Sequence, residues 1–297
     1  MSRSSKVFYL GLVALALLFC SPNSAHADTL YVSNSGNNTI EKIDSSGNAS
    51  VFVSTGLSEP MGLALDNSGN LYVANSGDSM VLKLDAGGNA SPFIGTGAQN
   101  PIGLAFDNSG NLYVALYSYN AIVKVTPGGS QSFFATSGLS GPSGLAVDSH
   151  GNLFVANVNN GTIEEYNTNG VGTVFASGLN FPQALAFDTS GKLYAADHGN
   201  NAIDEFDKNG NESIFASGIG GLSGLAFDSS GNLYASMVGG ANMILEFNPS
   251  GHATIFATGL SNPAFLAIQV PEPATWALVA LGAGALLRSH RLRHHSS

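Results

Sequence analysis

A five-residue phrase that recurs about every 40 residues constrains this chain more than any other feature. The phrase has the form Gly-Leu-Ala-Phe-Asp, and its aspartate stands at positions 66, 107, 148, 188 and 228, with Gln269 ending a worn sixth copy. The spacings between these positions are 41, 41, 40, 40 and 41 residues. A second phrase, Leu-Tyr-Val or a close variant, also occurs six times and begins at Leu30, Leu71, Leu112, Leu153, Leu193 and Leu233. A fixed period of this length indicates a repeat architecture.

Each repeat unit predicts four short strands. In the second unit these cover residues 63–66, 71–75, 81–85 and 91–94, with Gly-containing hairpin turns at 67–70 and 86–89. The aspartate that ends each first strand is expected to hold the hairpin by an Asx-type bond to backbone N–H groups. Prolines are expected in the loops before the first strands, at Pro60, Pro101, Pro142, Pro182 and Pro263. Four strands in about 40 residues predict one propeller blade per unit.

The two ends of the repeat region complement each other. The first unit begins at a second strand, whereas the last unit ends after a first strand, over residues 266–269. An open solenoid would need capping repeats, and none is visible. The predicted fold is therefore all-β: one six-bladed propeller over residues 28–269, closed by one C-terminal strand plus three N-terminal strands. Leucine and alanine alternate in the first strands, so large faces are expected to pack on small faces of the next blade.

The units resemble NHL repeats, in the pattern Pro-x-Gly-Leu-Ala-Phe-Asp-x-x-Gly-Asn-Leu-Tyr-Val-Ala-Asn followed by an apolar strand. The resemblance covers residues 28–269 and implies a six-bladed propeller that serves as an interaction platform. Relatives in the wider superfamily include gluconolactonases, streptogramin lyases and copper-dependent amidating lyases, which leaves an enzyme as the alternative.

Composition excludes several kinds of partner. Residues 28–270 contain five lysines, no arginine and nineteen carboxylates, a formal net charge of −14. Phosphate recognition needs Lys or Arg, so a nucleic-acid partner is not expected. The only cysteine, Cys20, precedes this region, which excludes a disulfide or a thiolate site within it.

The N-terminal segment has the features of a secretory signal. Arg3 and Lys6 precede an apolar run over residues 7–19, and Ala25-His26-Ala27 provides a small-residue cleavage site. We therefore expect residues 1–27 to be a signal peptide that directs the chain across the inner membrane.

The C-terminal segment, residues 270–297, resembles the PEP-CTERM sorting signal. Its features in order are Val270, Pro271, Glu272 and Pro273, an apolar run over 274–287, and Arg288, Arg291 and Arg293. A short transmembrane helix is expected in the apolar run, with the arginines on the cytoplasmic side. The resemblance implies processing by an exosortase, a Gram-negative bacterial host that often makes exopolysaccharide, and a cell-surface or extracellular-matrix location. Before processing, the segment would engage the inner membrane.

Candidate site residues were sought by comparing equivalent positions of the six units. The positions after the second strands are Asn34, Asn75, Leu116, Asn157, Asp197 and Met237, and they should form a ring at one face. Asn and Asp oxygens there could coordinate Ca²⁺ or another divalent cation. The other interpretation is that they hydrogen-bond their own loops.

Two further residues complete the candidate set. Glu59 is the only acid immediately before a first strand, and with Asn157 and Asp197 it would supply the ligand types of a gluconolactonase-like metal site. His198 follows Asp197 and would be the general base of a lyase. The local contexts of those enzymes are missing, so no catalytic residue and no cofactor is assigned. The predicted function is an exported binding or scaffold propeller, with exopolysaccharide or an envelope protein as possible partner. The alternative is a metal-dependent lactonase or lyase.

Overall fold

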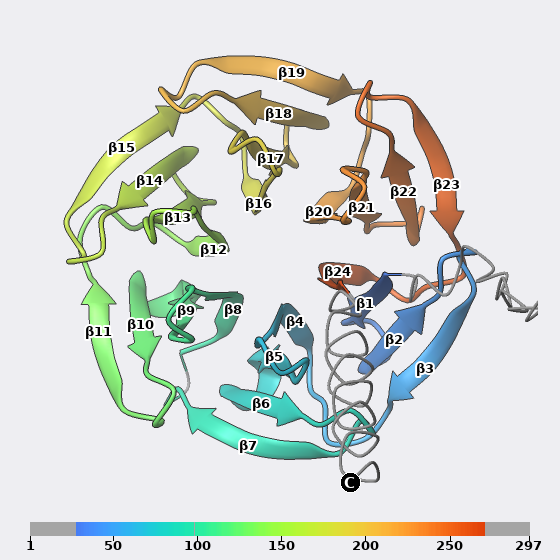
Figure 1. The fold of residues 1–297 in the computed structure, drawn as a ribbon, viewed down its shortest axis with the longest axis horizontal. Helices are drawn as coiled ribbons and strands as arrows, with labels where there is room; N and C mark the ends of the chain where they lie inside the picture. Colours follow the sequence, from blue (N-terminus) through green and yellow to red (C-terminus); the bar gives the residue numbers. More distant parts are fainter. Residues whose placement is uncertain (1–27, 98, 271–297) are drawn as a thin grey trace, which may run out of the picture.

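The computed structural model describes residues 28–97 and 99–270 and has 24 strands in six four-stranded antiparallel sheets. The sheets are arranged as blades around a central axis (Figure 1). This confirms the predicted six-bladed all-β propeller.

From the axis outward, the strands of each blade follow chain order, except that β24 is the inner strand of blade 1. Blade 1 contains β24 (Pro263–Gln269), β1 (Thr29–Asn34), β2 (Thr39–Ile43) and β3 (Ala49–Val53). Blade 2 contains β4 (Pro60–Leu65), β5 (Leu71–Asn75), β6 (Met80–Leu84) and β7 (Ala90–Gly95). Blade 3 contains β8 (Pro101–Phe106), β9 (Leu112–Leu116), β10 (Ala121–Val125) and β11 (Gln131–Ala135).

The remaining three blades repeat this plan. Blade 4 contains β12 (Pro142–Val147), β13 (Leu153–Asn157), β14 (Thr162–Tyr166) and β15 (Gly172–Ser177). Blade 5 contains β16 (Pro182–Phe187), β17 (Leu193–Asp197), β18 (Ala202–Phe206) and β19 (Glu212–Ser217). Blade 6 contains β20 (Leu222–Phe227), β21 (Leu233–Met237), β22 (Met243–Phe247) and β23 (Ala253–Ala257). Short 3₁₀ turns, η1 (Ser76–Asp78) and η2 (Tyr117–Tyr119), follow the second strands of blades 2 and 3.

Ring closure is made by the predicted pairing. The C-terminal β24 pairs antiparallel with β1, and the register places Leu30 opposite Ile268 and Tyr31 opposite Ala267. Figure 1 shows β24 beside β1 on the side of blade 1 that faces the axis, so the two ends of the described chain share one sheet.

The core lies between blades and follows the predicted large-on-small packing. Ala64 and Ala74 of blade 2 share one buried cluster with Leu104, Leu112 and Val114 of blade 3. The glycine at the middle of the first strand allows still closer contact. A Cβ placed on Gly103 would lie 1.9 Å from the backbone oxygen of Ser143, so only glycine fits there in this arrangement.

The hairpin aspartates have the predicted structural role. In blade 2, Oδ1 of Asp66 accepts the backbone N–H groups of Ser68 and Asn70, each at 2.9 Å. The same arrangement recurs at Asp107, Asp148, Asp188 and Asp228.

One local expectation was wrong. The prolines expected in the loops, such as Pro60 and Pro101, are instead the first residues of the first strands. A proline is compatible with this end position because its missing N–H is least needed where a strand starts.

Both terminal segments fall largely outside the described residues. This applies to the predicted signal peptide, the predicted transmembrane helix and the sorting-motif residues Pro271, Glu272, Pro273, Arg288, Arg291 and Arg293. Val270 is described and is exposed. Within residues 28–97 and 99–270, the structure has no helix long and apolar enough to cross a bilayer.

Candidate functional site

The propeller has two unlike faces, named here for the connections they carry. The loop face carries the connections after each second strand, such as residues 76–79, and those that lead from one blade to the next, such as residues 54–59. The turn face carries the tight hairpins after the first and third strands, such as residues 66–70 and 85–89. The ring positions Asn34, Asn75, Leu116, Asn157, Asp197 and Met237 end their second strands at the loop face.

The polar ring residues are bound to their own loops. Each side-chain oxygen accepts a backbone N–H from the connection that enters the sheet's first strand. The pairs are Asn34 with Ser261 at 3.3 Å, Asn75 with Ser58 at 2.7 Å, Asn157 with Ser140 at 3.0 Å and Asp197 with Asn180 at 2.9 Å. All four side chains are buried. They anchor loops, which is the second of the two interpretations considered for them.

The second polar atom of each of these side chains is also hydrogen-bonded. Nδ2 of Asn75 donates to Oδ2 of Asp78 at 2.9 Å. In blade 5 the same pair is exchanged, because Nδ2 of Asn200 donates to Oδ2 of Asp197 at 2.8 Å. The ring oxygens therefore accept hydrogen bonds from the connections that enter their blades. Among residues 28–97 and 99–270, no group of three or more His, Cys, Asp or Glu side chains could hold a metal.

Glu59 and His198 lie on the loop face but have different surroundings. Glu59 is exposed and has a positive φ of 46°, at a position that is Asn100, Gly141 and Asn262 in other blades. Its N–H donates to Oδ1 of Asn38 at 2.8 Å.

His198 is half-buried, and its Nδ1 lies 2.7 Å from the backbone oxygen of Leu222 in the next blade. A neutral imidazole with its proton on Nδ1 would keep a lone pair on Nε2.

The three residues of the lactonase-like set are not joined. Among the described residues, no hydrogen bond links Glu59 to Asn157 or Asp197.

The ring centre near the loop face contains apolar side chains. Met61 of blade 2 and Ile102 of blade 3 pack against the buried cluster that includes Ala184 of blade 5 and Ala264 of blade 1. Met61, Ile102 and Ala264 occupy the second position of their first strands, where the other three blades have Ser143, Gln183 and Ser223.

The third strands of three blades carry acids that are buried, at Glu164 and Asp204, or half-buried, at Glu41. Burial raises the pKa of Glu41, Glu164 and Asp204. For Asp204, burial and then the neighbouring carboxylates of Asp197 and Glu212 raise the pKa to about 7. Asp204 is only 3% exposed and its charged neighbours are carboxylates, so its surroundings favour the protonated form.

Blade 3 departs from the repeat on the loop face, as blade 6 does at Met237. Leu116 replaces the anchoring Asn or Asp, and Tyr119 stands where other blades have Asn37, Asp78, Asn160 and Asn200. The rings of Tyr119 and Phe133 stack with centroids 6.4 Å apart and an interplanar angle of 8°. Their exposed fractions are 58% and 60%.

These departures line one hollow of about 260 Å³ beside the outer strands of blades 2 and 3, with Leu116 and Tyr119 at its loop-face end. Its walls include Leu116, Tyr119, Val123 and Phe133 of blade 3, and the backbone of blade 2 at Gly95. Gln131 and Ser132 add an amide and a hydroxyl to its lining. This hollow was not predicted. The sequence does contain a signal for it, because Tyr119 stands where four other blades have Asn or Asp.

Comparison with known proteins agrees with the fold. The NHL repeat family model matches residues 139–166, which lie mainly in blade 4. No match was found among the curated proteins. A chain of the nidogen/laminin complex superposes with a TM-score of 0.74 at 20% identity, covering 81% of this chain and 98% of that one.

Two enzymes have the same fold at lower similarity. Virginiamycin B lyase from Staphylococcus aureus gives a TM-score of 0.60 at 17% identity, covering 80% of this chain and 78% of the lyase. A gluconolactonase from Xanthomonas campestris gives a TM-score of 0.62 at 18% identity, covering 70% and 79%. At these identities the similarity establishes the propeller fold and leaves the choice between binding protein and enzyme open.

Proposed function

We propose that this chain is an exported binding propeller that holds a neutral saccharide in the hollow of blade 3 and acts as a scaffold at the cell surface or in the matrix. The observation that carries the proposal is the convergence of the blade 3 departures, Leu116, Tyr119 and Phe133, on one hollow. Blades 1, 2, 4 and 5 keep Asn or Asp where blade 3 has Leu116 and blade 6 has Met237, so a residue that leaves the common pattern is free to serve binding.

The chemistry of the hollow fits a sugar ring. Two exposed, nearly parallel aromatic rings offer flat apolar faces, on which the C–H faces of a pyranose can stack. Gln131 and Ser132 provide amide and hydroxyl groups for sugar hydroxyls. None of the residues that line this hollow is charged, which favours a neutral saccharide over an anionic one.

The binding test uses the full purified chain and neutral oligosaccharides prepared from host exopolysaccharide, with affinity measured by calorimetry. Tyr119→Ala combined with Phe133→Ala should lower affinity at least tenfold, since each stacking contact of this kind contributes roughly 1 kcal/mol. Ile255→Ala is the matched control, because Ile255 occupies the Phe133 position in blade 6 and is 63% exposed. The proposal would be contradicted if the double variant bound the saccharide as tightly as the parent. It would also be contradicted if the Ile255→Ala control lost as much affinity as the double variant.

The enzyme alternative has its own result in the same experiment. A metal-dependent lactonase or lyase would copurify with a stoichiometric divalent cation and would turn over a lactone or streptogramin substrate. If His198→Ala abolished such turnover, the chain would be an enzyme and the binding proposal would be wrong. We expect no turnover, because the ring oxygens are already bonded within their blades.

Sorting by an exosortase is part of the same proposal and rests on the C-terminal residues. In a host with an exosortase, we expect mass spectrometry to find mature chain that has lost the segment after Pro273. Replacing Pro271, Glu272 and Pro273 by alanine should leave the tail in place and keep the protein in the inner membrane. Normal processing of that variant would remove this part of the proposal and leave the saccharide site unaffected.

A further inference from the structure

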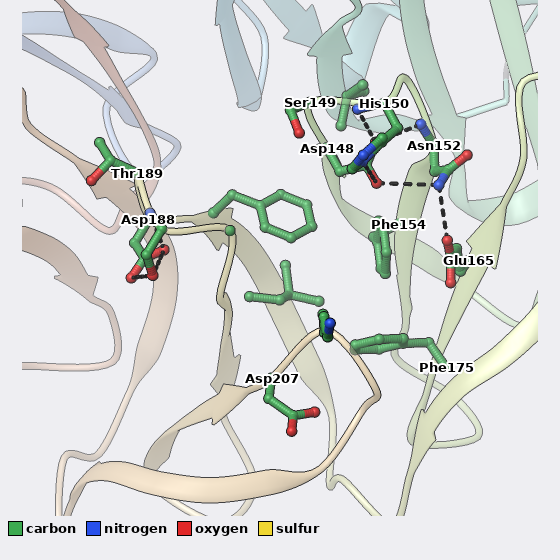
Figure 2. Close-up of a pocket in the computed structure, with 16 residues that line it drawn as sticks. Asp148, Ser149, His150, Asn152, Phe154, Glu165, Phe175, Asp188, Thr189 and Asp207 are labelled. Atoms are coloured by element: carbon green, nitrogen blue, oxygen red, sulfur yellow. Dashed lines mark hydrogen bonds and ion pairs between the residues drawn. The ribbon is translucent and has the colours of Figure 1, made fainter.

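The turn face has a pocket of about 490 Å³ between blades 4 and 5. Its floor includes Phe154, Phe175 and Phe187, and its walls carry the carboxylates of Asp148, Glu165, Asp188 and Asp207. Figure 2 shows Asp148, Asn152 and Glu165 joined by hydrogen bonds on one side, with Asp188 and Asp207 across the pocket. Lys208 and His150 are the basic residues of the lining, so with neutral histidine the formal charge is −3.

The other blades have an equivalent space beside the aromatic residue of the second strand, here called the niche, and they show which group occupies it. Opposite the aromatic residue of each second strand stands one residue of the third strand, in the series Lys42, Lys83, Lys124, Glu165, Glu205 and Glu246. Blades 1 to 3 therefore place a lysine here, and blades 4 to 6 a glutamate.

In blades 2 and 3 the lysine ammonium group lies over an aromatic ring and beside the hairpin aspartate. Nζ of Lys83 is 5.2 Å from the Tyr72 ring centroid and 3.6 Å from Oδ2 of Asp66. Nζ of Lys124 is 5.1 Å from the Tyr113 ring centroid and 3.7 Å from Oδ2 of Asp107. An ammonium ion on an aromatic face with a carboxylate at its side is a favourable arrangement.

Blade 1 repeats the aromatic part of this arrangement. Nζ of Lys42 lies 4.1 Å from the Phe52 ring centroid and 5.3 Å from that of Tyr31. The molecule thus contains three copies of an alkylammonium group seated in the same niche.

Blades 5 and 6 fill the niche in other ways. In blade 5, Nζ of Lys192 lies 2.6 Å from Oε1 of Glu205, and the Tyr194 hydroxyl donates to Oε2 at 2.7 Å. In blade 6, the Tyr234 hydroxyl donates to Oε1 of Glu246 at 3.2 Å.

Blade 4 has neither group. Its strands contain no lysine, and Phe154 replaces the tyrosine, so no hydroxyl reaches Asp148 or Glu165. The aromatic cage remains, since the Phe154 centroid is 5.0 Å from Phe175 and 5.1 Å from Phe187. The cage, its carboxylates and its volume are kept, while no lysine from the strands of blade 4 enters the niche. The basic groups near it come from turns: Nδ1 of His150 lies 3.5 Å from Oδ2 of Asp148, and Lys208 of blade 5 lines the pocket.

We propose that the pocket between blades 4 and 5 binds an alkylammonium group supplied from outside, either a free alkylamine or a lysine side chain of another protein. The ligand's ammonium group takes the place that Nζ of Lys83 and Lys124 takes in blades 2 and 3. Its alkyl stem lies on the phenylalanine floor, and the carboxylates of Asp148 and Glu165 balance the charge. This site lies between blades 4 and 5, shares no residue with the proposed saccharide site and does not depend on it.

The direct test measures calorimetric binding of Nα-acetyl-lysine amide to the full chain at physiological salt. Glu165→Lys rebuilds the internal cation of blades 2 and 3, so it should fold normally and lose at least tenfold in affinity. Glu246→Lys makes the same change of charge in blade 6 and should retain nearly all of the affinity. An unchanged affinity in Glu165→Lys would overturn the proposal, because the ligand would then bind elsewhere. Equal losses in both variants would also overturn it, because the pocket would then contribute nothing beyond net charge.

A second variant and further ligands complete the test. Phe154→Tyr restores the residue that blades 1, 2, 3, 5 and 6 carry, so it should fold and weaken binding severalfold by filling part of the pocket. Nε-acetyl-lysine amide lacks the ammonium charge and should not bind, and its binding would contradict the assigned chemistry. Butylamine that binds as tightly as the lysine derivative would identify a free amine as ligand. Tighter binding of a lysine-containing peptide would identify a protein-borne lysine.

Discussion

Asp204 carries a carboxyl group that folding removes from water beside the carboxyl of Asp197. Its pKa in the folded protein is about 7, well above its ordinary value of 3.8. Between these two values the unfolded chain releases the proton while the folded chain retains it. Ionisation therefore favours the unfolded state, and stability should fall as pH rises from about 4 to about 7.

Replacing Asp204 with asparagine should remove this dependence. We expect Asp204→Asn to be more stable than the parent at pH 8, by roughly 4 kcal/mol at most, with little difference at pH 4. Urea unfolding at both values measures the change in the free energy of unfolding. The exposed Glu59→Gln serves as a control with no expected effect. A parent-like fall in stability with pH in Asp204→Asn would show that another group is responsible.

The loop anchors of blades 2 and 5 provide a second prediction at this scale. Asn75 pairs with Asp78, whereas blade 5 has the exchanged pair of Asp197 with Asn200. Asn75→Asp alone places two carboxylates together and should cost about 1–3 kcal/mol. Adding Asp78→Asn rebuilds the blade 5 pair and should restore most of the loss, which chemical denaturation of the single and double variants would measure. If the second change adds to the loss, the exchanged pairs are not equivalent.

At the scale of the element, the inner strands are set by how closely neighbouring backbones approach. Gly103→Ala would force a Cβ to within 1.9 Å of the Ser143 oxygen, so the first strands of blades 3 and 4 would have to separate. We expect a loss of about 2–3 kcal/mol in the free energy of unfolding. Gly95→Ala is the control, because a Cβ added there would meet nothing within 4 Å and its φ is not positive. A neutral Gly103→Ala would mean that the inner strands are packed less tightly than described.

Much of the element-level structure could be predicted from the repeat alone. The period fixed the number of blades, the phrases located first and second strands, and the aspartate turns formed as expected. The role of Asn75 and its counterparts could not be decided, because the N–H groups that they accept belong to loops without a recognisable sequence pattern. The pocket between blades 4 and 5 was missed because it results from two missing groups. Phe154 lacks the tyrosine hydroxyl, and Glu165 stands where blades 1 to 3 have a lysine. Aligning Glu165 with Lys83 and Lys124 would have revealed it.

At the scale of the whole molecule, both proposed sites depend on a rigid ring. The saccharide hollow lies between blades 2 and 3, and the ammonium pocket lies between blades 4 and 5. Each therefore needs neighbouring blades held in register. That register is completed where β24 pairs with β1, since no other sheet of the described residues joins distant parts of the chain.

Closure of the ring can be measured with an engineered disulfide. Thr29 lies opposite Gln269 in the pairing of β1 with β24, so cysteines at these two positions should meet when the ring is closed. In a Cys20→Ser background, we expect Thr29→Cys with Gln269→Cys to oxidise rapidly to an intramolecular disulfide. Mass spectrometry should then find the two peptides linked in a monomeric chain, with stability at least equal to the parent. Two free thiols, or only intermolecular links, would contradict the closed six-bladed ring.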